Sequence, residues 1–194
     1  MHDSRGYTLV DTVITTCLCT VISAMALPMI GRTLDRERTI IGTQFLAGQL
    51  QRARLESLRR ARPVAVRLEL VGGRTSFQLF VDGDGDGVLQ GDVDVGLDPP
   101  LTPLEFLDDR ARDVSLRINQ PVTNPGGFGE LAPGDDPIRI GGTALLSFSP
   151  LGGSTAGTVY VAARRGPQMA IRIFGGTGRI RILTFDAQAR QWRQ

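Results

Sequence analysis

The chain has 194 residues with 22 basic and 20 acidic side chains, which gives a net charge of only +2 at neutral pH. All of these basic side chains are arginines, the only histidine is His2, and both cysteines lie close to the N-terminus, at Cys17 and Cys19. These features exclude a histidine-dependent catalytic triad, a histidine metal site and a disulfide framework from the domain that follows residue 30.

The chain begins with a short polar leader that is followed by an apolar stretch. The leader ends at Gly6, and residues 7–30 are nearly uncharged apart from Asp11. A helix of this length, at 1.5 Å per residue, is about long enough to cross a hydrocarbon core of roughly 30 Å. A carboxylate at that depth costs about 2.5–3.5 kcal/mol, so it normally has a partner. The sequence therefore predicts a transmembrane stalk helix that contains one functional acid.

Residues 31–62 continue the helix in an amphipathic form. Their apolar side chains recur at spacings near three and four, which places them on one helix face: Leu34, Ile41, Phe45, Leu46, Leu50, Ala53 and Leu58. Arginines crowd the last turns, where cations complement the helix dipole, and Pro63 follows. We therefore expect the helix to end at residue 62.

Residues 63–194 change to the two-residue period of strands and form the predicted β-rich domain. The expected strands are 64–70, 75–81, 114–118, 144–148, 158–163, 168–174 and 179–185. Two long loops, 82–112 and 119–137, separate them, and a polar tail follows the last strand. One long helix before a series of antiparallel strands is an α+β layout.

The first of these loops is strongly acidic. Between residue 82 and residue 113 the chain has ten acidic side chains and two arginines. Asp82, Asp84 and Asp86 occupy positions 1, 3 and 5 of a pattern that begins like a calcium-binding EF-hand loop. Its twelfth position is a valine and no helical pattern flanks it, so Asp92 is the candidate fourth ligand. The alternative to a Ca²⁺ site is a solvated turn, because Asp and Gly favour turns.

The C-terminal part of the chain is basic, with seven arginines and one aspartate from residue 164 onward. Arg179 and Arg181 alternate with isoleucines, so they share one face of a strand about 7 Å apart. Two guanidinium groups at this spacing suit successive phosphates of a nucleic acid, and Arg172, Arg164 and Arg165 extend the predicted patch. The alternative is an ordinary solvated strand face.

No arrangement of residues predicts an enzyme. The glycine-rich segment 175–178 joins two strand patterns, so no helix follows it to bind a phosphate at its N-terminus. Ser154 and Thr155 have no base in a recognisable pattern, and the carboxylates of an acidic loop are weak evidence for acid–base catalysis. We expect no cofactor other than Ca²⁺.

The segment Gly6-Tyr-Thr-Leu-Val-Asp11 resembles the type III signal of type IV pilins and type II secretion pseudopilins. The resemblance implies that a prepilin peptidase removes residues 1–6 by cleaving between Gly6 and Tyr7, and that Tyr7 is then N-methylated. It makes Asp11 the acid that pairs with the N-terminal amine of a neighbouring subunit, and Pro28 the kinking proline of the stalk. Tyr7 replaces the usual Phe and Asp11 the usual Glu. The alternative is a signal-anchor helix with an acid placed by chance.

Phe148-Ser-Pro-Leu-Gly, the Gly157-Thr strand and Gly178-Arg-Ile-Arg181 resemble the GspH/FimT branch of minor pseudopilins and minor pilins. The resemblance implies a pilin-like fold, in which the second half of the long helix packs on an antiparallel sheet. It also implies a filament subunit of a type II secretion system or type IV pilus, which other pilins contact through the N-terminal helix. Such a subunit spans the inner membrane once, with a cytoplasmic N-terminus and a periplasmic domain. The alternative is a DNA-binding minor pilin, because a Gly-Arg-x-Arg motif is associated in the FimT branch with DNA uptake.

Overall fold

The computed structural model describes residues 8–127 and 129–194, and it divides into two compact units, Met1–Leu34 and Asp35–Gln194. Gly6 and Tyr7, the expected cleavage position, lie outside the described residues. Helix α1 (Leu9–Arg60) contributes to both units.

Helix α1 is one uninterrupted element that continues through Pro28 and Gly31. It ends at Arg60, two residues before the predicted end at residue 62. The reason is that Ala61 adopts a left-handed backbone conformation, with φ of 53°, and that Pro63 disfavours helix in the residue before it. Among the described residues, no helix combines the length and the apolar character that a bilayer crossing requires.

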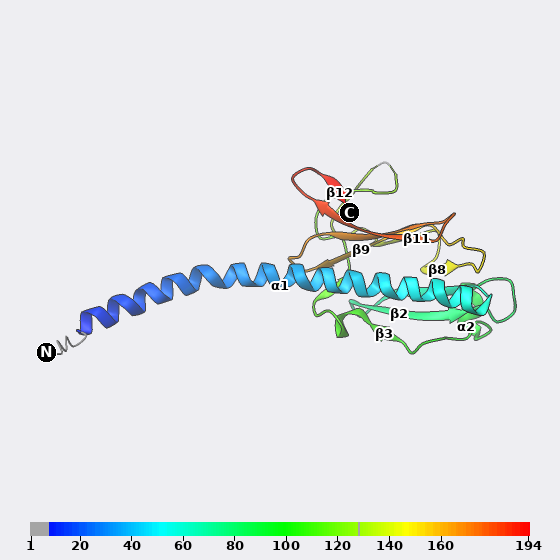
Figure 1. The fold of residues 1–194 in the computed structure, drawn as a ribbon, viewed down its shortest axis with the longest axis horizontal. Helices are drawn as coiled ribbons and strands as arrows, with labels where there is room; N and C mark the ends of the chain where they lie inside the picture. Colours follow the sequence, from blue (N-terminus) through cyan, green and yellow to red (C-terminus); the bar gives the residue numbers. More distant parts are fainter. Residues whose placement is uncertain (1–7, 128) are drawn as a thin grey trace. The chain divides into compact units, whose positions relative to one another are not determined.

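In the second unit, residues 35–60 of α1 pack against two antiparallel sheets (Figure 1). Sheet A has the strand order β3 (Glu105–Phe106), β2 (Arg74–Val81), β1 (Val64–Val71) and β8 (Leu145–Phe148). Sheet B has the order β12 (Gln191–Arg193), β11 (Arg179–Asp186), β10 (Met169–Phe174), β9 (Gly157–Ala163) and β4 (Val114–Leu116), and β7 (Ile138–Ile140) also pairs with β9. The predicted α+β class is confirmed, but sheets A and B and a two-stranded sheet of β5 (Val122–Thr123) and β6 (Glu130–Leu131) replace the single sheet that was expected.

The main core lies between α1 and both sheets. Leu46 and Leu50 are fully buried, as the spacing of the apolar residues predicted. They belong to one cluster with Phe77 of sheet A and with Val161 and Ile171 of sheet B. Complete burial of a side chain of this size contributes about 1.5–3 kcal/mol, so the helix holds the two sheets together through its apolar face.

Close approach to α1 requires glycine at two positions. A Cβ atom on Gly42 would lie 2.8 Å from Val114 Cγ1, and one on Gly166 would lie 2.2 Å from Thr39 Oγ1. Thr39 is fully buried, and its Oγ1 accepts a hydrogen bond from the Ala163 N–H at 3.1 Å. The turn between β9 and β10 is therefore fixed to the helix.

Residues 82–112, predicted as loop, contain α2 (Gln90–Val95), β3 and the 3₁₀ turn η1 (Leu107–Asp109). Helix α2 forms because Val88 and Val93 pack in a small cluster with Phe80 of sheet A, and Gly96 closes the helix in the left-handed conformation. The prediction that no helix flanks the acidic loop was therefore wrong.

Residues 119–137 and the C-terminal tail also contain strands that were not predicted: β5 (Val122–Thr123), β6 (Glu130–Leu131) and β12. Val122 and Leu131 are buried in a second cluster with Tyr160 and Phe185 of sheet B. Trp192 of β12 packs on Phe185, with ring centroids 5.1 Å apart, and donates a hydrogen bond to the Thr123 carbonyl at 2.7 Å. These strands form because a few apolar side chains cover the sheet face that α1 leaves open.

Candidate functional site

The start of α1 places Asp11 in a reciprocal cap. The Thr8 hydroxyl accepts a hydrogen bond from the Asp11 N–H at 3.3 Å. In return, Asp11 Oδ2 accepts hydrogen bonds from the Thr8 N–H at 3.1 Å and from the Thr8 hydroxyl at 2.6 Å. This arrangement is a capping box, with Thr at the N-cap and an acid three residues later. Thr8 was not predicted as a partner of Asp11, although the Thr-x-x-Asp spacing is the signal for it.

The helix that follows presents apolar side chains to its surroundings. Large apolar residues are 54–81% exposed along this segment, namely Leu9, Val10, Val13, Ile14, Leu18, Val21 and Ile22. Thr15, Thr16 and Thr20 each donate their hydroxyl hydrogen to the carbonyl four residues earlier, at 2.6–2.7 Å. The threonines therefore need no outside acceptor, and this segment presents an apolar surface.

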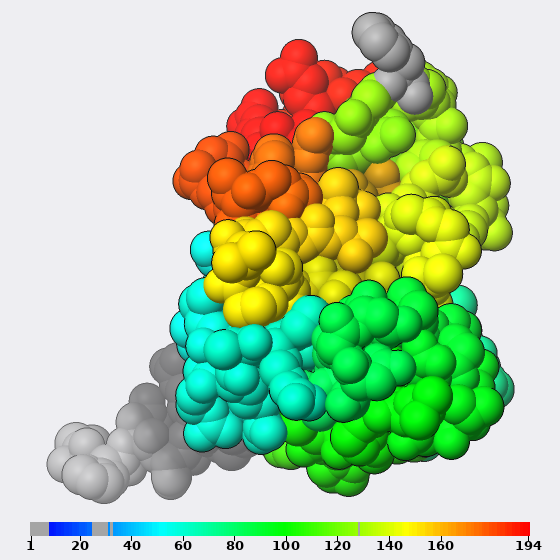
Figure 2. Space-filling model, turned by 90° about the vertical axis from the view of Figure 1, so that its right-hand side faces the viewer, coloured from blue at the N-terminus to red at the C-terminus, as the bar shows by residue number. Residues whose placement is uncertain are grey.

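The acidic loop lies at the end of the domain where α1 ends, and Figure 2 shows this end, with the loop in green. Asp82 is only 1% exposed, and its carboxylate accepts hydrogen bonds from the N–H groups of Gly85 at 2.6 Å and Gly87 at 3.2 Å. Both glycines have φ near 100°, at 103° and 104°, a conformation that favours glycine. Asp82 therefore stabilises the turn through hydrogen bonds to its backbone.

Asp98 holds the loop from its other end. It is fully buried and accepts hydrogen bonds from the Gly83 N–H at 2.9 Å and the Leu89 N–H at 3.0 Å. A Cβ atom on Gly83 would lie 1.9 Å from the Leu97 carbonyl oxygen, so the two ends of the loop meet here without room for a side chain. Sequence reasoning missed Asp98, because its position relative to the other aspartates matches no local pattern.

The structure brings together three of the four predicted calcium ligands, and Asp92 is not part of this group. Carboxylate oxygens of Asp82, Asp84 and Asp86 lie within 4.8 Å of one another. A hydrogen bond with Asp84, followed by burial and neighbouring charges, raises the pKa of Asp86 above its ordinary value of 3.8. Burial, followed by the charge of Asp84, raises the pKa of Asp92. Val93, at the twelfth EF-hand position, is buried and offers no ligand atom. A divalent cation would relieve the repulsion within this cluster.

Sheet B positions the predicted basic patch. Arg172 on β10 and Arg181 on β11 are direct cross-strand partners, and Arg179 stands opposite Phe174. The Phe174 ring centroid is 4.9 Å from Arg172 Cζ and 5.5 Å from Arg181 Cζ, so the ring interacts with both cations. A hollow of about 480 Å³ beside them is lined by Arg54, Phe174, Thr177, Arg179 and Arg181.

Arg164 and Arg165 do not join this patch, contrary to the prediction. They belong to the turn between β9 and β10, which contacts α1 through Gly166. Arg179 and Phe174 flank the turn at the opposite end of β10. Because a strand separates the two turns, the C-terminal positive charge forms two surfaces and not one.

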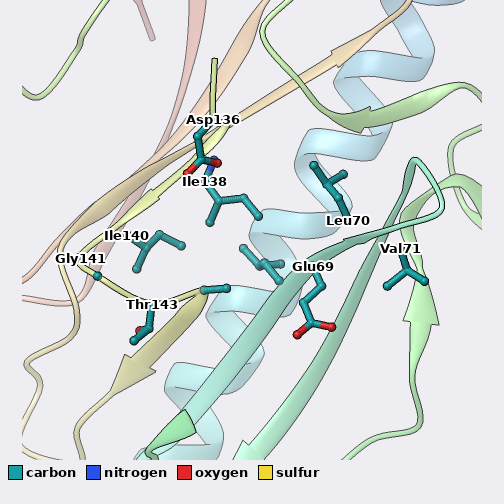
Figure 3. Close-up of a pocket in the computed structure, with 11 residues that line it drawn as sticks. Glu69, Leu70, Val71, Asp136, Ile138, Ile140, Gly141 and Thr143 are labelled. Atoms are coloured by element: carbon teal, nitrogen blue, oxygen red, sulfur yellow. The ribbon is translucent and has the colours of Figure 1, made fainter. Parts of the chain in front are cut away.

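A groove of about 510 Å³ lies between β1 and the segment that joins β7 to β8 (Figure 3). Leu70 lines it on the β1 side and Ile138 on the β7 side. The pairing of β1 with β8 ends at Arg67, so the β1 edge beyond that residue faces the groove. Glu69 and Asp136 are its acidic lining residues, and its lining includes no histidine, cysteine or arginine. The groove therefore offers strand edges and apolar surface.

Residues 43–182 match the protein family described as type II transport protein GspH. The matched region begins in the second half of α1 and ends within β11, so it covers well over half of the chain and includes both the acidic loop and Arg179 and Arg181. No curated protein and no solved structure matches the chain.

Proposed function

The chain belongs to the GspH family of type II transport proteins, the GspH/FimT branch of minor pseudopilins, and on this basis we propose that it is a minor subunit of a periplasmic filament. The filament is that of a type II secretion system or a type IV pilus, and the subunit helps its assembly and protein secretion. The family is one of structural, non-enzymatic subunits, so binding surfaces carry the function of the chain.

The observation that best supports this proposal is the helix of the first unit. Its exposed apolar side chains and internally bonded threonines suit a stalk that lies in the inner membrane before assembly and among other stalks afterwards. In this arrangement the N-terminus is cytoplasmic and the second unit is periplasmic. Asp11 then exchanges Thr8 for the N-terminal amine of a neighbouring subunit.

Processing by prepilin peptidase tests the proposal directly. When the chain is produced together with the peptidase, we expect it to lose residues 1–6 and to begin with N-methylated Tyr7, because Gly6 precedes the aromatic residue. Intact-mass measurement of the purified chain reports both changes, and a Gly6→Leu variant serves as the uncleaved control. Retention of Met1, or cleavage near Ala24, would contradict the proposed class of signal.

We also propose that the acidic loop binds Ca²⁺. Three of its carboxylates already converge within 4.8 Å. A hydrogen bond with Asp84 is the main cause that raises the pKa of Asp86, and burial is the main cause for Asp92, but the charges of neighbouring aspartates add to both shifts. A cation would neutralise these charges. Asp82, Asp84, Asp86 and Asp92 would supply the oxygen ligands that Ca²⁺ prefers.

Calcium is expected to stabilise the folded state of the detergent-solubilised chain by RT ln(1 + [L]/Kd), and therefore to raise its thermal unfolding midpoint. The gain should be largest at neutral pH and should shrink as pH falls. Without calcium, the raised pKa of Asp86 stabilises the folded state fully at pH values below the ordinary pKa of 3.8. This contribution to stability is lost as the pH rises through the raised pKa of the folded state. The double variant Asp84→Ala, Asp86→Ala should lose the calcium effect, while Asp109→Ala should keep it. No shift at millimolar Ca²⁺ would return the loop to a solvated turn.

A second candidate function is DNA binding in uptake, and the contact of Phe174 with two arginines favours it. Guanidinium groups bind phosphates, and an aromatic ring offers a surface on which a base can stack. Arg172, Arg179 and Arg181 surround this ring on one sheet.

The double variant Arg179→Gln, Arg181→Gln is expected to weaken DNA binding with little loss of stability. If both residues contact phosphates, the slope of log K against log salt should fall by roughly two. The matched control is Arg164→Gln, Arg165→Gln, which removes the same charge from the other turn. Fluorescence anisotropy with a labelled oligonucleotide measures both slopes. Equal losses in the two variants, or no binding by the wild-type chain at low salt, would remove this function.

A further inference from the structure

A row of side chains crosses sheet B and shares Arg172 with the basic patch. Arg139 on β7 is the cross-strand partner of Thr158 on β9, and Thr158 is also the partner of Arg172 on β10. Directly opposed residues of antiparallel strands project from the same face, so the two arginines flank Thr158. Neighbouring strands are about 4.8 Å apart, which separates the two arginine backbones by about 10 Å.

The three residues meet at a hollow of about 300 Å³. Asn124 and Gly126, from the segment that follows β5, complete its lining on the outer side. A Cβ atom on Gly126 would lie 3.7 Å from Arg172 Nη2, so this segment passes directly over the guanidinium group. Two guanidinium groups, one hydroxyl and one amide therefore border a single small space.

Neither arginine of this hollow is neutralised by a carboxylate. Ion pairs are common elsewhere in the chain, at Arg38, Arg59, Arg60, Arg67, Arg74, Arg110, Arg190 and Arg193. Within the described residues, Arg139 and Arg172 have no such partner, and Arg172 contacts only the Phe174 ring as a cation. The hollow consequently has an uncompensated positive charge.

The same face of sheet B also includes one unsatisfied hydroxyl. Tyr160 follows Thr158 on the same face, is fully buried, and its hydroxyl has no hydrogen-bond partner among the residues that the structure describes. Burial raises the pKa of Tyr160 to about 12, while the charges of Arg139 and Arg172 act in the opposite direction.

We propose that Arg139, Thr158 and Arg172 form a binding site for one tetrahedral oxyanion group, a phosphate or a sulfate. Each guanidinium group offers a planar fork of N–H donors that matches two oxygens of such an anion, and the Thr158 hydroxyl and the Asn124 amide add further donors. A carboxylate has two oxygens and needs only one fork, so two forks that line one hollow fit an anion with more oxygens. The site shares Arg172 with the basic patch, but its second guanidinium group is that of Arg139 and not that of Arg179 or Arg181.

The test is a titration of the detergent-solubilised full chain with inorganic phosphate, in which chloride keeps the ionic strength constant. The thermal unfolding midpoint should rise with phosphate and then saturate, as expected for a single site. Arg139→Gln should weaken the affinity at least about tenfold, because a charge-assisted pair contributes roughly 1.5–3 kcal/mol. Arg139 is exposed, so this variant should fold normally, and its midpoint without phosphate checks this.

Arg165→Gln is the matched control, since it removes one exposed arginine from the opposite end of the sheet and should keep the wild-type affinity. Parallel titrations with glycerol phosphate and with inorganic phosphate identify the source of the anion. Tighter binding of glycerol phosphate than of inorganic phosphate would assign the site to phosphate esters, and equal or weaker binding would assign it to the free anion. The proposal would be overturned if phosphate raised the unfolding midpoint no more than chloride does, or without saturation. It would also be overturned if Arg165→Gln lost as much phosphate affinity as Arg139→Gln.

Discussion

Replacement of Asp11 by alanine is expected to abolish incorporation of the chain into filaments while membrane insertion remains intact. In the proposed filament, stalks surround one another, and the N-terminal amine of a neighbouring subunit needs a counter-charge in this apolar environment. Without Asp11 that amine is buried alone, and removal of one partner of a buried pair costs about 3–5 kcal/mol. The measurement is the ratio of the chain in sheared filaments to the chain in the membrane fraction, in cells that produce the other subunits.

Two matched variants separate pairing with a neighbour from capping of the helix. Thr8→Ala removes the hydroxyl of the capping box, costs the helix about 1 kcal/mol and keeps the acid, so incorporation should stay near the wild-type level. Asp11→Glu keeps the charge on a longer side chain and should be tolerated or improve incorporation. Normal incorporation of Asp11→Ala would exclude the pairing role, and equal defects in Asp11→Ala and Thr8→Ala would assign Asp11 to the cap.

Replacement of Asp98 by alanine is expected to lower the free energy of unfolding of the second unit by about 3 kcal/mol. The variant leaves the N–H groups of Gly83 and Leu89 without their buried acceptor, and each unsatisfied donor costs about 1–3 kcal/mol. For a domain of this size the midpoint should fall by roughly 6–12 °C, which calorimetry or circular dichroism measures.

Asp109 provides the control for this effect. It is an acid of the same segment, but it is exposed and pairs with Arg74 at the surface, where ion pairs contribute little. Asp109→Ala should therefore leave the midpoint almost unchanged. If Asp98→Ala is equally mild, the loop does not depend on the buried carboxylate and reorganises around water.

The elements with strong local signals could be predicted from the sequence. The apolar spacing of residues 31–62 identified the helix face that contains Leu46 and Leu50, and the alternation of residues 64–81 identified the β1–β2 hairpin. Gly72 and Gly73 at its turn both have positive φ, which two-residue hairpin turns require. The meeting of Asp82, Asp84 and Asp86 also followed from local spacing.

The remaining elements depend on contacts between distant segments. Strand β7 has only three residues and exists because β9 offers it an edge, and β12 forms because Trp192 covers the outer face of sheet B. Asp98 and Arg139 belong to the same class: each has a role because the fold brings it to groups far away in the sequence. No period or spacing within the chain indicates such residues in advance.

The position of α1 between the two sheets has a mechanical consequence. In the proposed filament, a push or a retraction would apply force along the helix. In the second unit, residues 35–60 lie against both sheets at once. A pull along this helix is opposed at the same time by side chains of sheet A and of sheet B. Many packing contacts between the helix and the sheets must therefore shift together before the helix can move. The hydrogen bond from the Ala163 N–H to Thr39 Oγ1, close to the point where the pull enters the domain, resists the first displacement. The same architecture that buries the core therefore makes the domain stiff along the direction in which a filament works.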